Sequence, residues 1–242
     1  MIGITDISAA ELLRKVLDKF GPAFAIATSF QDEGMVLVDM AMRISPRVRV
    51  LTVDTGRLPA ATFDMIGMVE RHYGIAVETV RPDAGEVAAM TSRFGPDLFR
   101  DDPAFRRLCC EVRKVRPLEA VPDVRAWAFG LRRKQSESRR DIAQVEEAGG
   151  RLRLCPLAAW TKGEVADYLR GHGVPRHPLY AAGYATIGCD PCTRAVDPGE
   201  DERAGRWWWE LDTARECGIH FSPDGAVERQ VDVLLREVLA AR

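Results

Sequence analysis

The sequence predicts an α/β fold with a doubly wound, mainly parallel sheet. Short apolar runs alternate with longer amphipathic stretches through the first half of the 242 residues. Glycine, proline and aspartate mark the points where each run stops. This alternation is typical of parallel strands joined by helical crossovers. The expected strands are residues 24–28, 48–53, 75–80 and 124–129.

End signals locate the helices. Ser8 and Glu11 form a capping-box pattern, and the helix that they start stops at Gly21. Thr161 and Glu164 repeat the pattern further along the chain. The expected helices are residues 8–20, 35–44, 59–73, 85–93, 109–121, 162–172 and 227–239.

The alternation of strands and helices ends near Gly173, and proline, glycine and cysteine dominate until the terminal helix. We therefore expect an α/β domain over residues 1–180. Residues 181–242 are expected to form a C-terminal segment packed on the same domain.

The composition of the chain argues against several classes of protein. The chain is 46% hydrophobic and 29% charged, which is typical of a globular protein. A net charge of −2 and a pI near 6.1 argue against a dedicated nucleic-acid binder. The apolar runs are shorter than a membrane span, and the N-terminus lacks the features of a signal peptide. We expect a cytoplasmic protein with no membrane partner, and a homo-oligomer is compatible with the sequence.

Three loops follow predicted strands, at Ser29, Asp54 and Gly130. Ligands of doubly wound sheets bind beyond the carboxyl ends of the strands, where such loops meet. The sequence therefore predicts a binding site on this rim.

Two close cysteine pairs, Cys109-Cys110 and Cys189-x-x-Cys192, indicate a metal site, since reducing cytosol disfavours disulfides. The second pair alone could be a redox dithiol or half of a zinc site. Neighbouring side chains on a helix diverge by about 100°. An iron–sulfur cluster suits such a pair better than one zinc ion, because it offers each thiolate its own iron.

The other two cysteines differ in their surroundings. Cys155 follows an apparent strand and is interpreted as a core residue. Cys217 has Gly218 beside it, and His220 could hold it as a thiolate. From these residues alone, a structural role for Cys217 stays the more common alternative.

Four motifs stand out in the second half of the chain: CCEVRK at 109–114, GCDPCTR at 188–194, ERAGRWWWE at 202–210 and ECGIH at 216–220. Together they resemble the assimilatory adenylyl-sulfate reductases, which are related to the phosphoadenylyl-sulfate reductases. The resemblance covers most of the chain and implies a fold of the adenine nucleotide alpha hydrolase (ATP-pyrophosphatase-like) type. It also implies a 4Fe-4S cluster on Cys109, Cys110, Cys189 and Cys192, with Cys217 as the catalytic nucleophile.

The loops after the first two predicted strands resemble the same family. Residues 29–34 occupy the place of the family's phosphate-binding loop, and Asp54, Thr55 and Gly56 resemble its second strand-end motif. The loop lacks the double glycine and the lysine of the ATP pyrophosphatases, which argues against ATP hydrolysis at the α-phosphate.

The segment 130–136 resembles the family's arginine loop, which holds the anionic end of the substrate. Guanidinium groups bind phosphate and sulfate in bidentate fashion. Lys114 is close enough in sequence to Cys109 to connect the cluster with the substrate anion. The candidate anion-binding residues are Arg132, Arg133, Arg203 and Arg206.

The resemblance implies that Cys217 attacks the sulfur of adenosine 5′-phosphosulfate and releases AMP. Thioredoxin or glutaredoxin would then free sulfite, in sulfate assimilation and cysteine biosynthesis. Three alternatives stay open: a phosphoadenylyl-sulfate or dual-specificity reductase, an ATP-dependent RNA-thiolating enzyme of the same fold, and a zinc-stabilised binding module.

Overall fold

Side chains alternate between the two faces of a six-stranded sheet. In this computed structural model, which describes residues 7–210 and 225–241, Phe24 and Ile26 of the central strand face one apolar core, whereas Ala25 faces another. The strand order is β3-β2-β1-β4-β6-β5, and only the edge strand β5 runs antiparallel. The strands are β1 (Phe24–Ala27), β2 (Arg49–Val53), β3 (Glu78–Val80), β4 (Ala126–Phe129), β5 (Val145–Ala148) and β6 (Arg151–Leu154).

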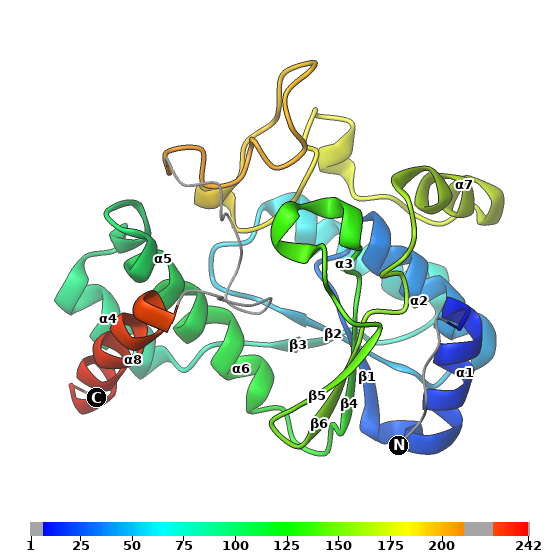
Figure 1. Cartoon of the computed structure of the whole chain (residues 1–242), viewed down its shortest axis with the longest axis horizontal. Helices are drawn as coiled ribbons and strands as arrows, with labels where there is room; N and C mark the ends of the chain where they lie inside the picture. The colour runs from blue at the N-terminus through cyan, green and yellow to red at the C-terminus, as the bar shows by residue number, and fades with distance from the viewer. Residues whose placement is uncertain (1–6, 211–224, 242) are drawn as a thin grey trace.

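Helices cover both faces of the sheet (Figure 1). The first core joins the sheet to α1, α2, α3 and α7, and a second core lies between the sheet and α6. A third apolar cluster, formed by α4, α5 and α8, contains the paired cysteines. The helices are α1 (Ala9–Phe20), α2 (Asp32–Ile44), α3 (Ala60–Tyr73), α4 (Ala84–Phe94), α5 (Pro103–Cys110), α6 (Arg116–Glu119), α7 (Lys162–His172) and α8 (Gly225–Ala240).

The order of the strands reverses between β1 and β4. The chain proceeds from β1 outward through β2 to β3, and then returns to place β4 on the other side of β1. The connections diverge at this switch point, so a crevice opens beyond the carboxyl ends of the two strands. The predicted rim, with its loops after β1 and β4, is confirmed at this place.

Residues 173–210 lie over the carboxyl edge of the sheet, as the yellow and orange ribbon in Figure 1 shows. The amide of Ile187 donates to Gln31 Oε1 at 2.8 Å, and Asp190 N donates to Arg57 O at 2.8 Å. These bonds attach the segment to the loops after β1 and β2. The boundary expected at residue 180 stays a prediction.

Some predicted boundaries were wrong. The helix expected from Cys109 begins at Pro103, because Asp102 caps it by accepting from Ala104 N at 2.7 Å. After Cys110 the helix widens into a π-helical turn over Glu111–Val115 before α6. The antiparallel strand β5 was not predicted, since its sequence, VEEA, lacks an apolar alternation. No helix in the described part of the chain is long and apolar enough to span a bilayer.

Candidate active site

A cleft of about 630 Å³ opens at the switch point between β1 and β4. Its floor is formed by the ends of β1, β2 and β4, and its roof by the segment 173–210. Ser29, Lys114, Arg132, Arg203 and Arg206, all predicted to act on the substrate, line it. The volume suits a nucleotide-sized ligand.

The loop after β1 is shaped by close contacts. Thr28 Oγ1 accepts from Phe30 N at 2.8 Å, and buried Phe30 adopts a positive φ of 58°. A Cβ on Gly34 would lie 2.2 Å from Thr28 Oγ1, and one on Gly130 would lie 2.7 Å from Gly34 N. Both glycines therefore allow α2 to start directly against β1 and β4. Gln31, whose role the sequence left open, ties this loop to the roof through Ile187.

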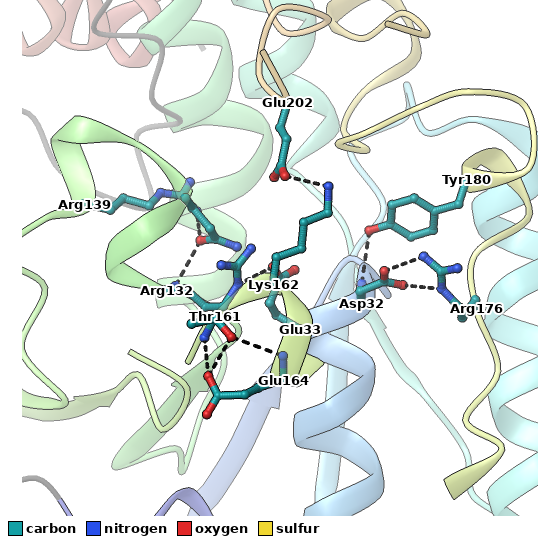
Figure 2. Close-up of polar contacts among 11 residues, drawn as sticks. Asp32, Glu33, Arg132, Arg139, Thr161, Lys162, Glu164, Arg176, Tyr180 and Glu202 are labelled. Carbon is teal, nitrogen blue, oxygen red and sulfur yellow. Dashed lines mark hydrogen bonds and ion pairs between the residues drawn. The ribbon is translucent and has the colours of Figure 1, made fainter. Parts of the chain in front are cut away.

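Basic side chains in the cleft are paired with carboxylates (Figure 2). Arg132 Nε donates to Glu33 Oε1 at 2.7 Å, and both side chains are largely buried. Lys162 Nζ lies 2.6 Å from Glu202 Oε1. The pairing matters most for Arg132, because this buried guanidinium stays neutralised by Glu33 when the cleft holds no anion.

Arg176 forms a further pair across the cleft edge. Its Nη2 lies 2.6 Å from Asp32 Oδ2, and Asp32 N donates to Tyr180 Oη at 3.1 Å (Figure 2). The roof thus closes on the first turn of α2, at the place where a phosphate-binding loop would present its amides.

Arg133 points elsewhere than its neighbour Arg132. Its Nε donates to Ile142 O at 2.9 Å, and it is not among the residues that line the cleft. Arg139, which the sequence did not single out, does line the cleft and donates to Gln135 Oε1 at 2.5 Å. The signal for Arg139 was its position in the same strand-end loop as Arg132.

Asp54, Thr55 and Gly56 lie at the cysteine side of the cleft rather than among its lining residues. Asp54 Oδ1 accepts from Gly56 N at 3.0 Å, which fixes the turn after β2. Thr55 Oγ1 lies 3.3 Å from Cys189 Sγ, and Thr55 O accepts from Arg113 Nη1 at 2.8 Å. Their predicted contact with the substrate stays a prediction, whereas their contact with the cysteine region is direct.

The four paired cysteines converge on one small cavity. Cys109 and Cys110 end α5, and Cys189 and Cys192 come from a short turn in the roof. The thiols of these residues line a cavity of about 20 Å³ together with cationic and aromatic side chains. These are Arg57, Phe99, Arg106, Arg113 and Lys114.

The protein environment acts on these thiols in opposite directions. Burial raises the pKa of Cys109, while Arg113 opposes that shift. Burial also raises the pKa of Cys192, to about 12. Nearby cations are what a set of thiolates would need to stay charged in this apolar place.

Lys114 is the single described residue that lines both the cleft and the cysteine cavity. The π-helical turn that contains it follows Cys110 directly. Lys114 therefore lies between the two cavities, and its contact with a substrate anion stays a prediction.

Of the other two cysteines, Cys155 and Cys217, the structure describes the first, which does not line the cysteine cavity. Cys155 is buried in the second core, and burial raises its pKa to about 12, which makes it a poor nucleophile. Cys217 and His220 lie outside the described residues.

His177, which lines the cleft, was missed by the sequence analysis. It is 1% exposed, its Nδ1 accepts from Leu179 N at 3.2 Å, and its Nε2 lies 3.1 Å from Thr62 Oγ1. Because Nδ1 is an acceptor, the ring is neutral and Nε2 donates to Thr62. Burial lowers the pKa of His177, although Asp32 opposes this shift.

A pH dependence follows from that neutral ring. A group whose pKa is lower in the folded state supports stability above its unfolded pKa, about 6.5 for histidine, and loses that support as the pH falls. We expect the Tm of the wild type to drop between pH 7.5 and pH 5.5 by about 2–4 °C more than that of His177→Gln. Thermal melts of both proteins at the two pH values measure this. Equal drops would contradict a buried neutral ring.

The molecule is thus an α/β protein with a cleft lined by cations at the switch point of its sheet and, beside that cleft, a cavity lined by four cysteines. The chain belongs to the phosphoadenosine phosphosulfate reductase family, because residues 23–195 match the phosphoadenosine phosphosulfate reductase domain. The predicted fold class is confirmed.

Named relatives place the chain within that family. It is 44% identical to the adenosine 5′-phosphosulfate reductase of Allochromatium vinosum over 224 residues, which are 90% of this chain and 87% of the relative. It is 41% identical over 229 residues to 5′-adenylylsulfate reductase 3, chloroplastic, of Arabidopsis thaliana, covering 90% of this chain and 49% of the relative.

Solved structures agree. The phosphoadenylyl-sulfate reductase of Candida auris, in a phosphate complex, superposes with a TM-score of 0.64 at 25% identity, over 79% of this chain and 91% of that one. The FMN adenylyltransferase of Candida glabrata, at 12% identity and a TM-score of 0.54 over 96% of this chain and 86% of that one, shares the fold alone.

Proposed function

We propose that this protein is an adenylyl-sulfate reductase, which converts adenosine 5′-phosphosulfate to sulfite and AMP in sulfate assimilation and cysteine biosynthesis. One observation carries the proposal: in a chain of this family, a cleft lined by cationic side chains and a four-cysteine cavity meet at Lys114. The relatives named above as adenosine 5′-phosphosulfate and 5′-adenylylsulfate reductases support the choice of substrate.

Four cysteines around one cavity have the donor chemistry of a 4Fe-4S cluster, which would be held by Cys109, Cys110, Cys189 and Cys192. Thiolates are the ligands of such clusters, and each would bind a separate iron. Among the described residues, the buried Nε of Arg113 has no hydrogen-bond partner, and Arg113 lines the cavity. A donor left in this position favours an anionic group beside it. The cluster would supply structural order and an electrostatic environment for Lys114.

The cleft would hold the nucleotide with its sulfate toward the cations of the roof. Arg203 and Arg206 come from the segment that covers the cleft, and Arg132 comes from the loop after β4. Three arginines from two separate segments can surround a phosphosulfate group. Lys114 would complete this set from the cysteine side.

The chemistry would be carried by Cys217. Its thiolate attacks the sulfur of the substrate, the bond between that sulfur and the bridging oxygen breaks, and AMP leaves with the electron pair. His220 would favour the thiolate form of Cys217. The cleft cations would screen the repulsion between thiolate and sulfonate, and would stabilise the charge on AMP.

The reductant would be thioredoxin or glutaredoxin. One of its thiolates attacks the Cys217 sulfur, sulfite leaves with the electron pair, and the resulting mixed disulfide is resolved by the second thiol of the reductant. The dithiol is oxidised by two electrons and the thiosulfonate is reduced to sulfite and free Cys217. We place this reaction in the cytoplasm.

The loop geometry supports the reductase over ATP-dependent RNA thiolation. The amide of Asp32, in the first turn of α2, donates to Tyr180 instead of facing an open pyrophosphate site. The net charge of −2 offers no field for RNA.

Sulfite formation tests the proposal. Anaerobically purified protein is incubated with thioredoxin and either adenosine 5′-phosphosulfate or its 3′-phosphorylated form, and kcat/KM is compared. We expect a value at least about 10-fold higher for the unphosphorylated substrate, a difference of roughly 1.4 kcal/mol. Comparable values would make the protein a dual-specificity reductase, and no sulfite from either substrate would overturn the proposal.

A further inference from the structure

We propose that Gly188 and Trp207 are positioning residues that fix the guanidinium of Arg206 for a substrate oxyanion, a phosphate or a sulfate. The inference rests on the proposed function, because it assumes that Arg206 binds the substrate. It adds two residues whose part in binding is exerted through Arg206.

Gly188 has no side chain, so the guanidinium of Arg206 can pack directly against its backbone. A Cβ added to Gly188 would lie 2.6 Å from each of Cζ, Nη1 and Nη2 of Arg206. Equal approach to all three atoms means that the guanidinium lies face-on against the glycine. A methyl group there would occupy the space of the guanidinium, so any other residue must displace it.

Trp207 restricts where the guanidinium could move. Arg206 Cζ lies 4.4 Å from the centroid of the Trp207 ring, within cation–π distance. Arg106 Cζ lies 4.2 Å from the same centroid, and Arg106 forms a buried ion pair with Glu210. The indole is thus held by an arginine that also lines the cysteine cavity.

The backbone of Trp207 is unusual for so large a residue. Its φ is 44°, in the left-handed region that bulky side chains rarely adopt, and the side chain is 1% exposed. Strained backbone of this kind persists where the surroundings enforce it, and it gathers at functional sites. The strain places the ring beneath Arg206.

The same segment fixes the backbone of Arg206. Arg206 and Thr193 form an antiparallel bridge, and Trp207 N donates to Cys192 O at 3.4 Å. Gly188 directly precedes Cys189, so both sides of the Cys189–Cys192 turn contact Arg206 or its neighbour. Order in the cysteine turn is thereby coupled to order in the cleft.

The guanidinium is prepared for a ligand. Arg206 is 7% exposed and lines the cleft, and its Nε has no hydrogen-bond partner among the described residues. Its Nη1 makes one long bond of 3.4 Å, to Ile187 O. A buried guanidinium with unused donors is a strong site for an oxyanion, because the hydrogen bonds are charge-assisted.

The test measures the Kd of adenosine 5′-phosphosulfate in a Cys217→Ser background without reductant, so that the ligand is not consumed. We expect Arg206→Ala to weaken binding by about 10- to 100-fold, the effect of losing charge-assisted hydrogen bonds. Gly188→Ala should weaken it by at least about 10-fold on the same grounds. The double variant should bind no more weakly than Arg206→Ala alone, since both changes remove one interaction.

Controls separate positioning from general damage. Gly171→Ala, a helical position where a Cβ meets nothing within 4 Å, should leave Kd unchanged. Gly188→Ala should keep the iron content of the parent and melt in one cooperative transition, even if its Tm is lower. Additive losses in the double variant, or an unchanged Kd for Gly188→Ala, would overturn the proposal.

A crystal structure of Gly188→Ala gives an answer that does not depend on the substrate. The guanidinium of Arg206 must leave its place over Trp207, and an unmoved guanidinium would overturn the positioning role. If Arg206 moves but the parent neither binds the nucleotide nor forms sulfite, the proposed function fails and the positioning of Arg206 stands.

Discussion

Cys109→Ser is expected to remove bound iron and sulfite formation together, with activity falling at least about 100-fold. Cys109 ends α5 and lines one cavity with the other three paired cysteines. A hydroxyl in place of a thiolate would leave one iron without its ligand, next to the turn that holds Lys114. Iron analysis, the visible spectrum and the sulfite assay measure the effect.

Cys155→Ser is the matched control. Cys155 is as buried as Cys109, with 6% and 8% exposure respectively, but it lies in a different core, between the sheet and α6. The variant should keep both iron and turnover, even if its Tm falls. A Cys109→Ser protein with a full complement of iron would show that the ligand assignment is wrong.

Cys217→Ser is expected to abolish sulfite formation, by about 1,000-fold or more, while nucleotide binding and iron content stay at wild-type levels. The loss is large because a serine hydroxyl does not ionise near neutral pH, and because the sulfate ester that it could form has an oxygen at the position where the thiol of the reductant must attack sulfur. The measurement is kcat with thioredoxin, alongside the Kd for AMP.

The selective loss distinguishes this variant from the cluster variants. A fall in kcat with unchanged Kd and iron is typical of a nucleophile, whereas Cys109→Ser should lose both the cluster and activity. Full turnover in Cys217→Ser would require another nucleophile.

The sheet could be predicted because its strands leave local signals. Residues 24–28 and 124–129 are short apolar runs followed by glycine- or serine-containing loops, and they became β1 and β4. Crossover connections between parallel strands are almost always right-handed, so alternating strands and helices leave few possible topologies. In these topologies ligands bind beyond the carboxyl ends of the strands, which indicates the position of the cleft. The cysteine site could be predicted because closely spaced cysteine pairs in a reducing compartment usually indicate a metal or redox site.

The environment of each cation could not be predicted. Arg132 and Arg133 are adjacent in sequence, yet Arg132 pairs with Glu33 in the cleft and Arg133 donates to Ile142 O outside it. Only the backbone of the loop decides which of two neighbours points inward. The pairing of Lys162 with Glu202 likewise joins residues that are distant in the chain.

The contacts of Arg206 with Gly188 and Trp207 could not be predicted either. In the sequence, Gly188 is simply the residue before a cysteine pair, and Trp207 is the first residue of an aromatic run. Their contact with Arg206 depends on the bridge between Thr193 and Arg206 and on a positive φ at Trp207. Neither feature has a local sequence signal, because tertiary contacts impose both.

The most direct test of the mechanism is the mass of the peptide that contains Cys217, after incubation with adenosine 5′-phosphosulfate and no reductant. We expect an added SO₃ group, about 80 Da, on Cys217, as for a covalent thiosulfonate intermediate. Thioredoxin should then release that group as sulfite in equal amount. An adduct on Cys155, or sulfite formed with Cys217 never modified, would contradict this mechanism.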